Sequence, residues 1–291
     1  MNLMPRNLSR KSKNLPKMIF FDKVTKRFPN DTLAIEEVTF EVEPGEFVYI
    51  SGPSGAVKTT LGRLMIGEMI PSSGDLRVGD YDLTNLDKKD LPFLRRQIGF
   101  VFQDFKLLPD RTAAENIALS LEILDKAMDE VYTRVEELMV LTGLEGKGDL
   151  FPNQLSGGEA QRAVIARAIA SDPAVLFADE PTGNLDTVTA RAIVDLLDEI
   201  NKAGTTVVMA THDEDLMSVD KTRHIKLEKG KLVEDTGAKK KLVEEKKDGK
   251  VDGDKVKADD KDVNKEDKDE KKDKNRDKGD RKDNKGKDKD E

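Results

Sequence analysis

A loop with glycines, followed by a lysine and two threonines, is the first segment whose residue types could do chemistry. It reads Gly52-Pro53-Ser54-Gly55-Ala56-Val57-Lys58-Thr59-Thr60, between an apolar stretch and an amphipathic one. In a strand–loop–helix unit, backbone N–H groups and the helix N-terminus converge on phosphates. Lys58 would place a positive charge against the β- and γ-phosphates, and the Thr59 hydroxyl would ligate Mg²⁺. The loop therefore predicts a phosphate-binding site.

One position of this loop departs from the phosphate-loop pattern. Val57 stands where the pattern has its second required glycine. A β-branched side chain is stiff and adds bulk where the backbone must approach a phosphate closely. Two outcomes are open: the side chain points into a tolerant gap and binding is weakened, or the loop distorts and binding is largely lost. We expect impaired rather than abolished binding.

Two carboxylates follow an apolar stretch further along the chain. The run 175–178 has the composition of a buried strand, and Asp179 and Glu180 come directly after it. Ligands of α/β proteins bind at the carboxyl ends of the strands. Asp179 is expected to hold Mg²⁺ through water, because Mg²⁺ prefers oxygen ligands, and Glu180 to act as the general base that positions an attacking water. The alternative is an acidic turn that only ends a strand.

A short string with two glycines opens the helix predicted up to Ala170. It reads Leu-Ser-Gly-Gly-Glu-Ala-Gln-Arg, in which Ser156 is a natural N-cap and Gly157 and Gly158 let backbone amides meet a phosphate. Alone, this string could be an ordinary cap. Leu-Ser-Gly-Gly followed by Gln and Arg is the signature of ABC ATPases, and the chain resembles that family over about residues 18–237, with its motifs in order.

The resemblance assigns further residues to an ATP site. Gln103 resembles the glutamine that touches Mg²⁺ and the attacking water, and Phe28 the aromatic residue that stacks on adenine. Asp186 resembles the residue that contacts the facing subunit, and His212 the histidine that contacts the γ-phosphate. The alternatives are a surface glutamine, a core phenylalanine, a helix cap and a structural histidine. His224 has no such setting and is expected to be structural.

The resemblance also implies partners. In this family the phosphate loop of one copy and the signature of another enclose each ATP, so Ser156, Gly157 and Gly158 would act in trans in a homodimer. Closing and reopening of the dimer moves a membrane partner, which would place the chain in the cytoplasm at the inner face of the cell membrane. The strings 99–112 and 178–186 resemble the cell-division branch of the family. ATPases of lipoprotein-release or macrolide-export transporters, and a nucleotide-binding scaffold impaired by Val57, are the alternatives.

The elements that must position these residues alternate between strand and helix. The pattern predicts an α/β fold with a mainly parallel sheet and a helical subdomain at about 104–170. The resemblance implies that this fold is of the P-loop NTPase (ABC ATPase) type, with N-terminal antiparallel strands. The predicted strands include 18–24, 38–42, 47–51, 99–102 and 206–210. The whole ATPase domain is expected to span residues 18–237.

Composition bounds the rest of the chain. The 291 residues include no cysteine, which excludes disulfides and thiolate zinc sites, and no apolar run is long enough to cross a bilayer. Residues 1–17 are expected to be a disordered basic leader, with attraction to anionic lipid and a start at Met18 as further readings. Residues 238–291 are almost all charged or polar and are expected to be disordered.

The mixed charge of this tail argues against nucleic acid as a partner. Lysines alternate with Asp and Glu, which neutralise the field that attracts phosphates, and no aromatic residue is present for stacking on bases. Removing the residues after Gly237 is therefore expected to leave the Kd for ATP unchanged in a binding titration. A large loss of affinity would show that the tail belongs to the fold.

Overall fold

The computed structural model describes residues 17–52, 55–213, 216 and 222–237. All of these belong to one compact unit. The expectations for residues 1–16 and 238–291 lie outside the described residues, as do Pro53 and Ser54 of the phosphate loop.

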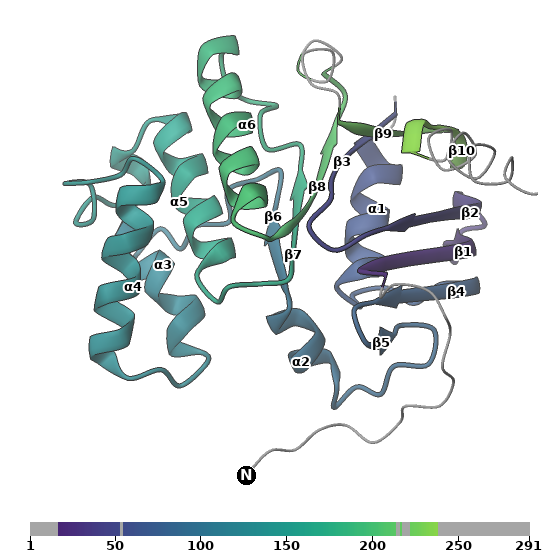
Figure 1. Ribbon diagram of the computed structural model, residues 1–291, viewed down its shortest axis with the longest axis horizontal. Coiled ribbons are helices and arrows are strands. Elements are labelled where there is room, and N and C mark those ends of the chain that lie inside the picture. Colours follow the sequence, from purple (N-terminus) through teal and green to yellow (C-terminus); the bar gives the residue numbers. More distant parts are fainter. Residues whose placement is uncertain (1–16, 53–54, 214–215, 217–221, 238–291) are drawn as a thin grey trace, which may run out of the picture. The chain divides into compact units, whose positions relative to one another are not determined.

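Two sheets form the framework of the described part (Figure 1). The first has the order β2-β1-β4-β5 with antiparallel neighbours, and the second has the order β10-β9-β3-β8-β7-β6. From β9 to β6 the neighbours of the second sheet are parallel, and β10 pairs antiparallel with β9. The strands are β1 (Ile19–Arg27), β2 (Leu33–Val42), β3 (Phe47–Ser51), β4 (Ser73–Val78), β5 (Tyr81–Asp82), β6 (Ile98–Val101), β7 (Val175–Asp179), β8 (Thr206–Thr211), β9 (Arg223–Glu228) and β10 (Lys231–Asp235).

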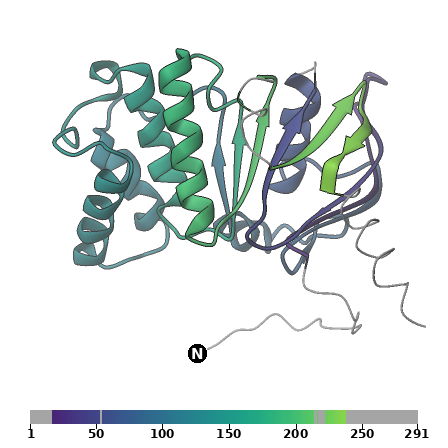
Figure 2. The ribbon, with the colours of Figure 1, turned by 45° about the horizontal axis from the view of Figure 1, so that its top comes forward.

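Helices cover both faces of the second sheet. Helix α1 lies between the two sheets, and α3, α4 and α5 gather beside the β6 edge as the predicted helical subdomain (Figure 2). The helices are α1 (Gly55–Met65), α2 (Leu91–Arg96), α3 (Ala113–Glu122), α4 (Met128–Leu141), α5 (Gly157–Ile169) and α6 (Thr187–Lys202), with a short 3₁₀ turn at Pro152–Gln154. No helix in the described ranges is long and apolar enough to cross a membrane.

The central strands are buried on both faces, which explains their continuous apolar sequences. Successive side chains of a strand point to opposite faces. In β7, Val175 and Phe177 pack into the cluster around α1 and the first sheet, whereas Leu176 and Ala178 pack into the cluster formed by α3 to α6. Strands β3 and β8 alternate in the same way. The strands of the second sheet are thus fixed between two cores, and their ends are held in place.

Several predicted strand boundaries differ from those of the structure, by up to five residues. Strand β1 continues to Arg27 and β2 begins at Leu33, because the two strands pair along this whole length and bury Ala34 and Ile35. Strand β6 runs from Ile98 to Val101, so it begins and ends one residue earlier than predicted. Of the site residues, Asp179 changes element, because it is the last residue of β7 rather than the first residue after it.

Candidate active site

The carboxyl ends of three adjacent parallel strands bring the predicted residues together. In the register of the sheet, Ser51 of β3 lies beside Thr211 of β8, and Asp179 of β7 beside Ala210. The phosphate loop, the acidic pair and His212 each follow one of these ends. The topology therefore places at one edge of the sheet groups that lie far apart in the sequence.

Lys58 is held on the inner side of this edge. Its side chain is 1% exposed, and Nζ donates to the carbonyl oxygen of Gly52 at 2.7 Å and lies 3.1 Å from Glu180 Oε1. Position 52 accepts only glycine, because an added Cβ would lie 2.3 Å from the carbonyl oxygen of Leu227. The Lys58 ammonium group is thus held beside Gly52, the first residue of the phosphate loop.

Glu180 joins the lysine to the histidine. His212 Nδ1 lies 2.6 Å from Glu180 Oε2, so the two carboxylate oxygens face two different partners. The Glu180 side chain is 7% exposed, whereas that of His212 is largely exposed. Glu180 also has φ 49, a backbone conformation that non-glycine residues rarely adopt and that persists only when its surroundings hold it. Its carboxylate is therefore fixed in direction.

Asp179 and Thr59 form a second contact at the same edge. The Thr59 hydroxyl donates to Asp179 Oδ2 at 2.7 Å, and the other oxygen, Oδ1, is buried with no hydrogen-bond partner among the described residues. Burial raises the pKa of Asp179, although the Thr59 hydrogen bond acts in the opposite direction. A buried carboxylate oxygen without a partner is costly, and a carboxylate beside a hydroxyl is an oxygen donor set of the kind Mg²⁺ takes. These residues fit a magnesium ion.

Val57 does not distort the helix that carries Lys58. Helix α1 begins at Gly55, so Val57 has a helical backbone, and its side chain is 8% exposed within the apolar cluster of α1 and the first sheet. The Val57 side chain therefore points into the core. This matches the placement of the first expected outcome, in which the side chain finds room within the fold.

The signature string forms a capped helix start. The Ser156 Oγ accepts a hydrogen bond from the Glu159 amide, and the Glu159 carboxylate accepts one from the Ser156 amide, which makes a capping box for α5. The prediction that Ser156 is an N-cap is confirmed. A hydrogen bond from Lys147 is the largest of the causes that lower the pKa of Glu159 to about 2. Gly158 packs closely against Thr189 of α6, where a Cβ would come within 2.5 Å of a methyl group.

The remaining predicted residues lie apart from the lysine cluster. Asp186 caps α6 by accepting from the amides of Val188 and Thr189, as the alternative reading predicted. Phe28 is half-buried beside the first sheet, and Gln103 is exposed just beyond β6. In the described ranges no hydrogen bond or ion pair joins Phe28, Gln103, Ser156 or Asp186 to the cluster of Lys58.

His224 has the structural setting expected of it. Its ring lies edge-on to Tyr49, with 5.4 Å between the ring centroids, and its amide donates to Thr236.

Comparison with known proteins places this arrangement in a family. The ABC transporter family model matches residues 35–183. The cell-division ATP-binding protein FtsE of Streptococcus pneumoniae is 47% identical over 212 residues, which is 73% of this chain and 92% of that protein. FtsE of Bacillus subtilis is 45% identical over 75% of this chain and 96% of that protein, and FtsE of Escherichia coli 46% identical over 74% and 97%.

Two solved structures of ABC proteins also resemble this chain. The dimeric ATP-binding cassette MJ0796 bound to ADP and Pi matches with a TM-score of 0.68 and 36% identity, covering 75% of this chain and 97% of that chain. The protein cbiO1 of Clostridium perfringens, described as part of the ABC transporter complex cbiONQ, matches with a TM-score of 0.71 and 27% identity, covering 81% of this chain and 94% of that chain. The chain therefore belongs to the ABC transporter family and is an ATP-binding cassette of the type represented by FtsE.

Proposed function

We propose that two copies of this chain close around ATP, hydrolyse it and drive an integral membrane partner of the FtsX type in cell division, with a transporter permease as the alternative partner. The chain would then work in the cytoplasm, on the inner face of the cell membrane, through that partner. One observation carries the proposal: Lys58, Glu180 and His212 are joined at the edge of the sheet where one buried oxygen of Asp179 has no hydrogen-bond partner within the described part of the chain.

The cluster suits ATP hydrolysis in a definite way. Lys58 would leave Glu180 and the Gly52 carbonyl to meet the β- and γ-phosphates, and the backbone N–H groups of the loop, which Pro53 lacks, would surround them. The freed Glu180 carboxylate would then accept a proton from an attacking water, and its contact with His212 keeps it turned toward the site. The His212 side chain is largely exposed and would also reach the γ-phosphate from its place beside Glu180.

Magnesium would be held by Thr59, Asp179 and Gln103. When bound, it supplies positive charge to the phosphate oxygens. The Asp179 oxygen that lacks a partner among the residues the structure describes supports this assignment for Thr59 and Asp179. Gln103 would have to move in from its exposed position.

The residues outside the cluster are proposed to complete the site from both copies. Phe28 would stack on adenine. Ser156, Gly157 and Gly158 would bind the ATP held by the other copy. Asp186 would contact that copy in addition to capping α6. The dimeric solved relative bound to ADP and Pi supports a dimer as the working form.

ATP turnover by the purified chain tests the proposal. Hydrolysis should require Mg²⁺, and the rate per molecule should rise with protein concentration because the active form is a dimer. A rate per molecule that is constant over the whole concentration range would count against shared sites.

A second candidate function is supported by Val57. A chain that binds ATP weakly and turns it over little would act as a nucleotide-dependent scaffold for the same membrane partner. The retained Lys58, Thr59, Asp179 and Glu180 favour the enzyme.

Replacing Phe28 with Ala should raise the KM for ATP about tenfold, because stacking on a base contributes about 1–3 kcal/mol. The control is Phe28→Tyr, which keeps a ring face and should keep KM near that of the parent. Steady-state kinetics over a range of ATP concentrations measures both. Equal KM values for the Ala variant and the parent would mean that Phe28 serves only the core.

A further inference from the structure

The segment from Gln103 to Thr112, called the Q segment here, has no regular secondary structure. It leaves β6 after Val101 and enters α3 at Ala113. Few of its bonds run between its own backbone groups; the Arg111 amide, for example, donates to the Leu108 carbonyl. Side chains from two helices of the helical subdomain make most of its other hydrogen bonds.

Arg167 of α5 holds the first part of the Q segment. Its guanidinium donates to the carbonyl oxygen of Lys106 at 2.8 Å and to that of Phe105 at 3.3 Å. A guanidinium presents several N–H donors in a rigid plane, so it fixes two carbonyls together in a way that an ammonium cannot. The α5 carbonyl of Arg167 itself accepts from Ser120 of α3, which ties the two helices at this level.

The arginine holds a strained stretch of backbone. Lys106 has φ 51, in the left-handed region that non-glycine residues rarely adopt. Such conformations persist only where the surroundings over-determine them, and they gather at functional sites. The bond from Arg167 to the Lys106 carbonyl is one such constraint.

Asn116 of α3 holds the second part of the Q segment. Its side chain is fully buried; Nδ2 donates to the carbonyls of Leu108 and Arg111, and Oδ1 accepts from the Leu108 amide at 2.8 Å. Arg167 also reaches Asn116 Oδ1, at 3.4 Å. The two side chains therefore form one network that spans the Q segment.

We propose that Arg167 and Asn116 are positioning residues of the ATPase, which set where Gln103 can reach and couple it to the signature helix. Helix α5 carries Ser156 at its first turn and Arg167 about 16 Å further along its axis. A shift of this helix when Ser156 engages the second copy is then passed to Gln103 through the Arg167 contacts. This inference rests on the proposed function, because it concerns the same site.

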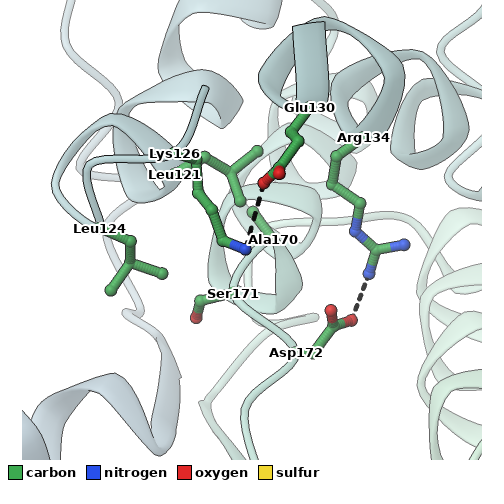
Figure 3. Close-up of a pocket in the computed structure, with 8 residues that line it drawn as sticks. All are labelled: Leu121, Leu124, Lys126, Glu130, Arg134, Ala170, Ser171 and Asp172. Atoms are coloured by element: carbon green, nitrogen blue, oxygen red, sulfur yellow. Dashed lines mark hydrogen bonds and ion pairs between the residues drawn. The ribbon is translucent and has the colours of Figure 1, made fainter. Parts of the chain in front are cut away.

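A second arginine in the same subdomain provides a matched control. Arg134 of α4 pairs with Asp172, just beyond α5, on the wall of a cavity of about 230 Å³ (Figure 3). Arg134 also pairs with Glu137 and, in the part of the chain that the structure describes, makes no hydrogen bond to the Q segment. Arg134 therefore ties α4 to the turn after α5, at a place away from the Q segment.

Hydrogen exchange without nucleotide tests the contact itself. In Arg167→Gln, the amides of Leu108 and Arg111 should exchange at least about tenfold faster than in the parent, because the network that closes over them has lost a charged donor. In Arg134→Gln the same amides should exchange at the parent rate. Equal exchange in the two variants would overturn the proposal.

Kinetics tests the catalytic consequence. Arg167→Gln should lower kcat about 10- to 100-fold with KM for ATP within about twofold, because misplacing a catalytic group from a distance affects the reaction more than ground-state binding. Arg167→Lys, which keeps a charge and one donor, should fall between. Adding Lys106→Gly to Arg167→Gln should recover part of kcat, because glycine adopts the left-handed backbone without the arginine.

The outcomes separate this inference from the proposed function. A parent chain that hydrolyses no ATP would overturn both the proposed function and the positioning role of Arg167 in the reaction. A parent that hydrolyses ATP, with Arg167→Gln and Arg134→Gln at equal kcat, would overturn the inference alone. Loss of folding in Arg167→Gln is recognised by its circular dichroism, and Arg167→Lys with unchanged kcat and unchanged exchange would then decide against the proposal.

Discussion

Replacing Glu180 with Gln is expected to lower kcat for ATP hydrolysis about a thousandfold, within the range that a general base contributes. Glutamine has nearly the same shape and cannot accept the proton of an attacking water. The Kd for Mg·ATP should stay within a few fold of the parent value, because Lys58 loses a competing partner rather than a phosphate contact. The reaction step and the binding step thus respond differently to one substitution.

Steady-state hydrolysis and a binding titration on the same preparation measure the two effects. Glu136→Gln, on an exposed position of α4, is the matched control and should leave both unchanged. Because the Glu180→Gln variant should bind ATP without hydrolysing it, it should also accumulate as a dimer, which sedimentation velocity measures. A turnover equal to that of the parent would rule out Glu180 as the base and point to another residue or to a contaminating ATPase.

Replacing Val57 with Gly is expected to act in opposite directions on binding and on folding. The Kd for Mg·ATP should fall about tenfold, because glycine lets the loop backbone come close to the phosphates. The free energy of unfolding should fall by about 2–4 kcal/mol, from the lost burial of the valine side chain and the lower helix propensity of glycine. Val57 is 8% exposed within helix α1, so both costs apply.

Calorimetric titration and urea unfolding without nucleotide separate the two effects. Val57→Ala is the control: it keeps a helical residue and should lose about 1 kcal/mol or more of stability, with a smaller gain in affinity than glycine. An unchanged Kd in Val57→Gly would mean that the valine does not obstruct the phosphates. An unchanged unfolding free energy would mean that it does not contribute to the core.

The sequence contained enough to place the lysine cluster. Lys58, Asp179 and His212 each follow an apolar run with strand character, and the carboxyl ends of parallel strands share one edge of the sheet. The fold class, the caps at Ser156 and Asp186 and the helical subdomain followed from the same local patterns, and the structure confirms them. These features depend on short stretches of sequence, which is why they were predictable.

Features that depend on distant contacts were not predictable in this way. The ion pair of Lys58 with Glu180 joins residues that lie far apart in the sequence, and no short sequence pattern predicts it. The inward turn of Val57 depends on how α1 lies between the two sheets. Arg167 lies on an otherwise apolar face of its helix, and a charged residue in such a place indicates that its guanidinium has polar partners inside the fold. Its hydrogen bond to the Lys106 carbonyl spans 61 residues of sequence. Only the folded chain shows which carbonyls it meets.

Isothermal titration calorimetry shows whether this sheet edge binds Mg·ATP. We expect saturable heat with Mg·ATP for the chain, a lower Kd for Val57→Gly, and a much higher Kd when Lys58 is replaced by Ala. If saturating Mg·ATP gave no heat with either the chain or Val57→Gly, the sheet edge would not be an ATP site.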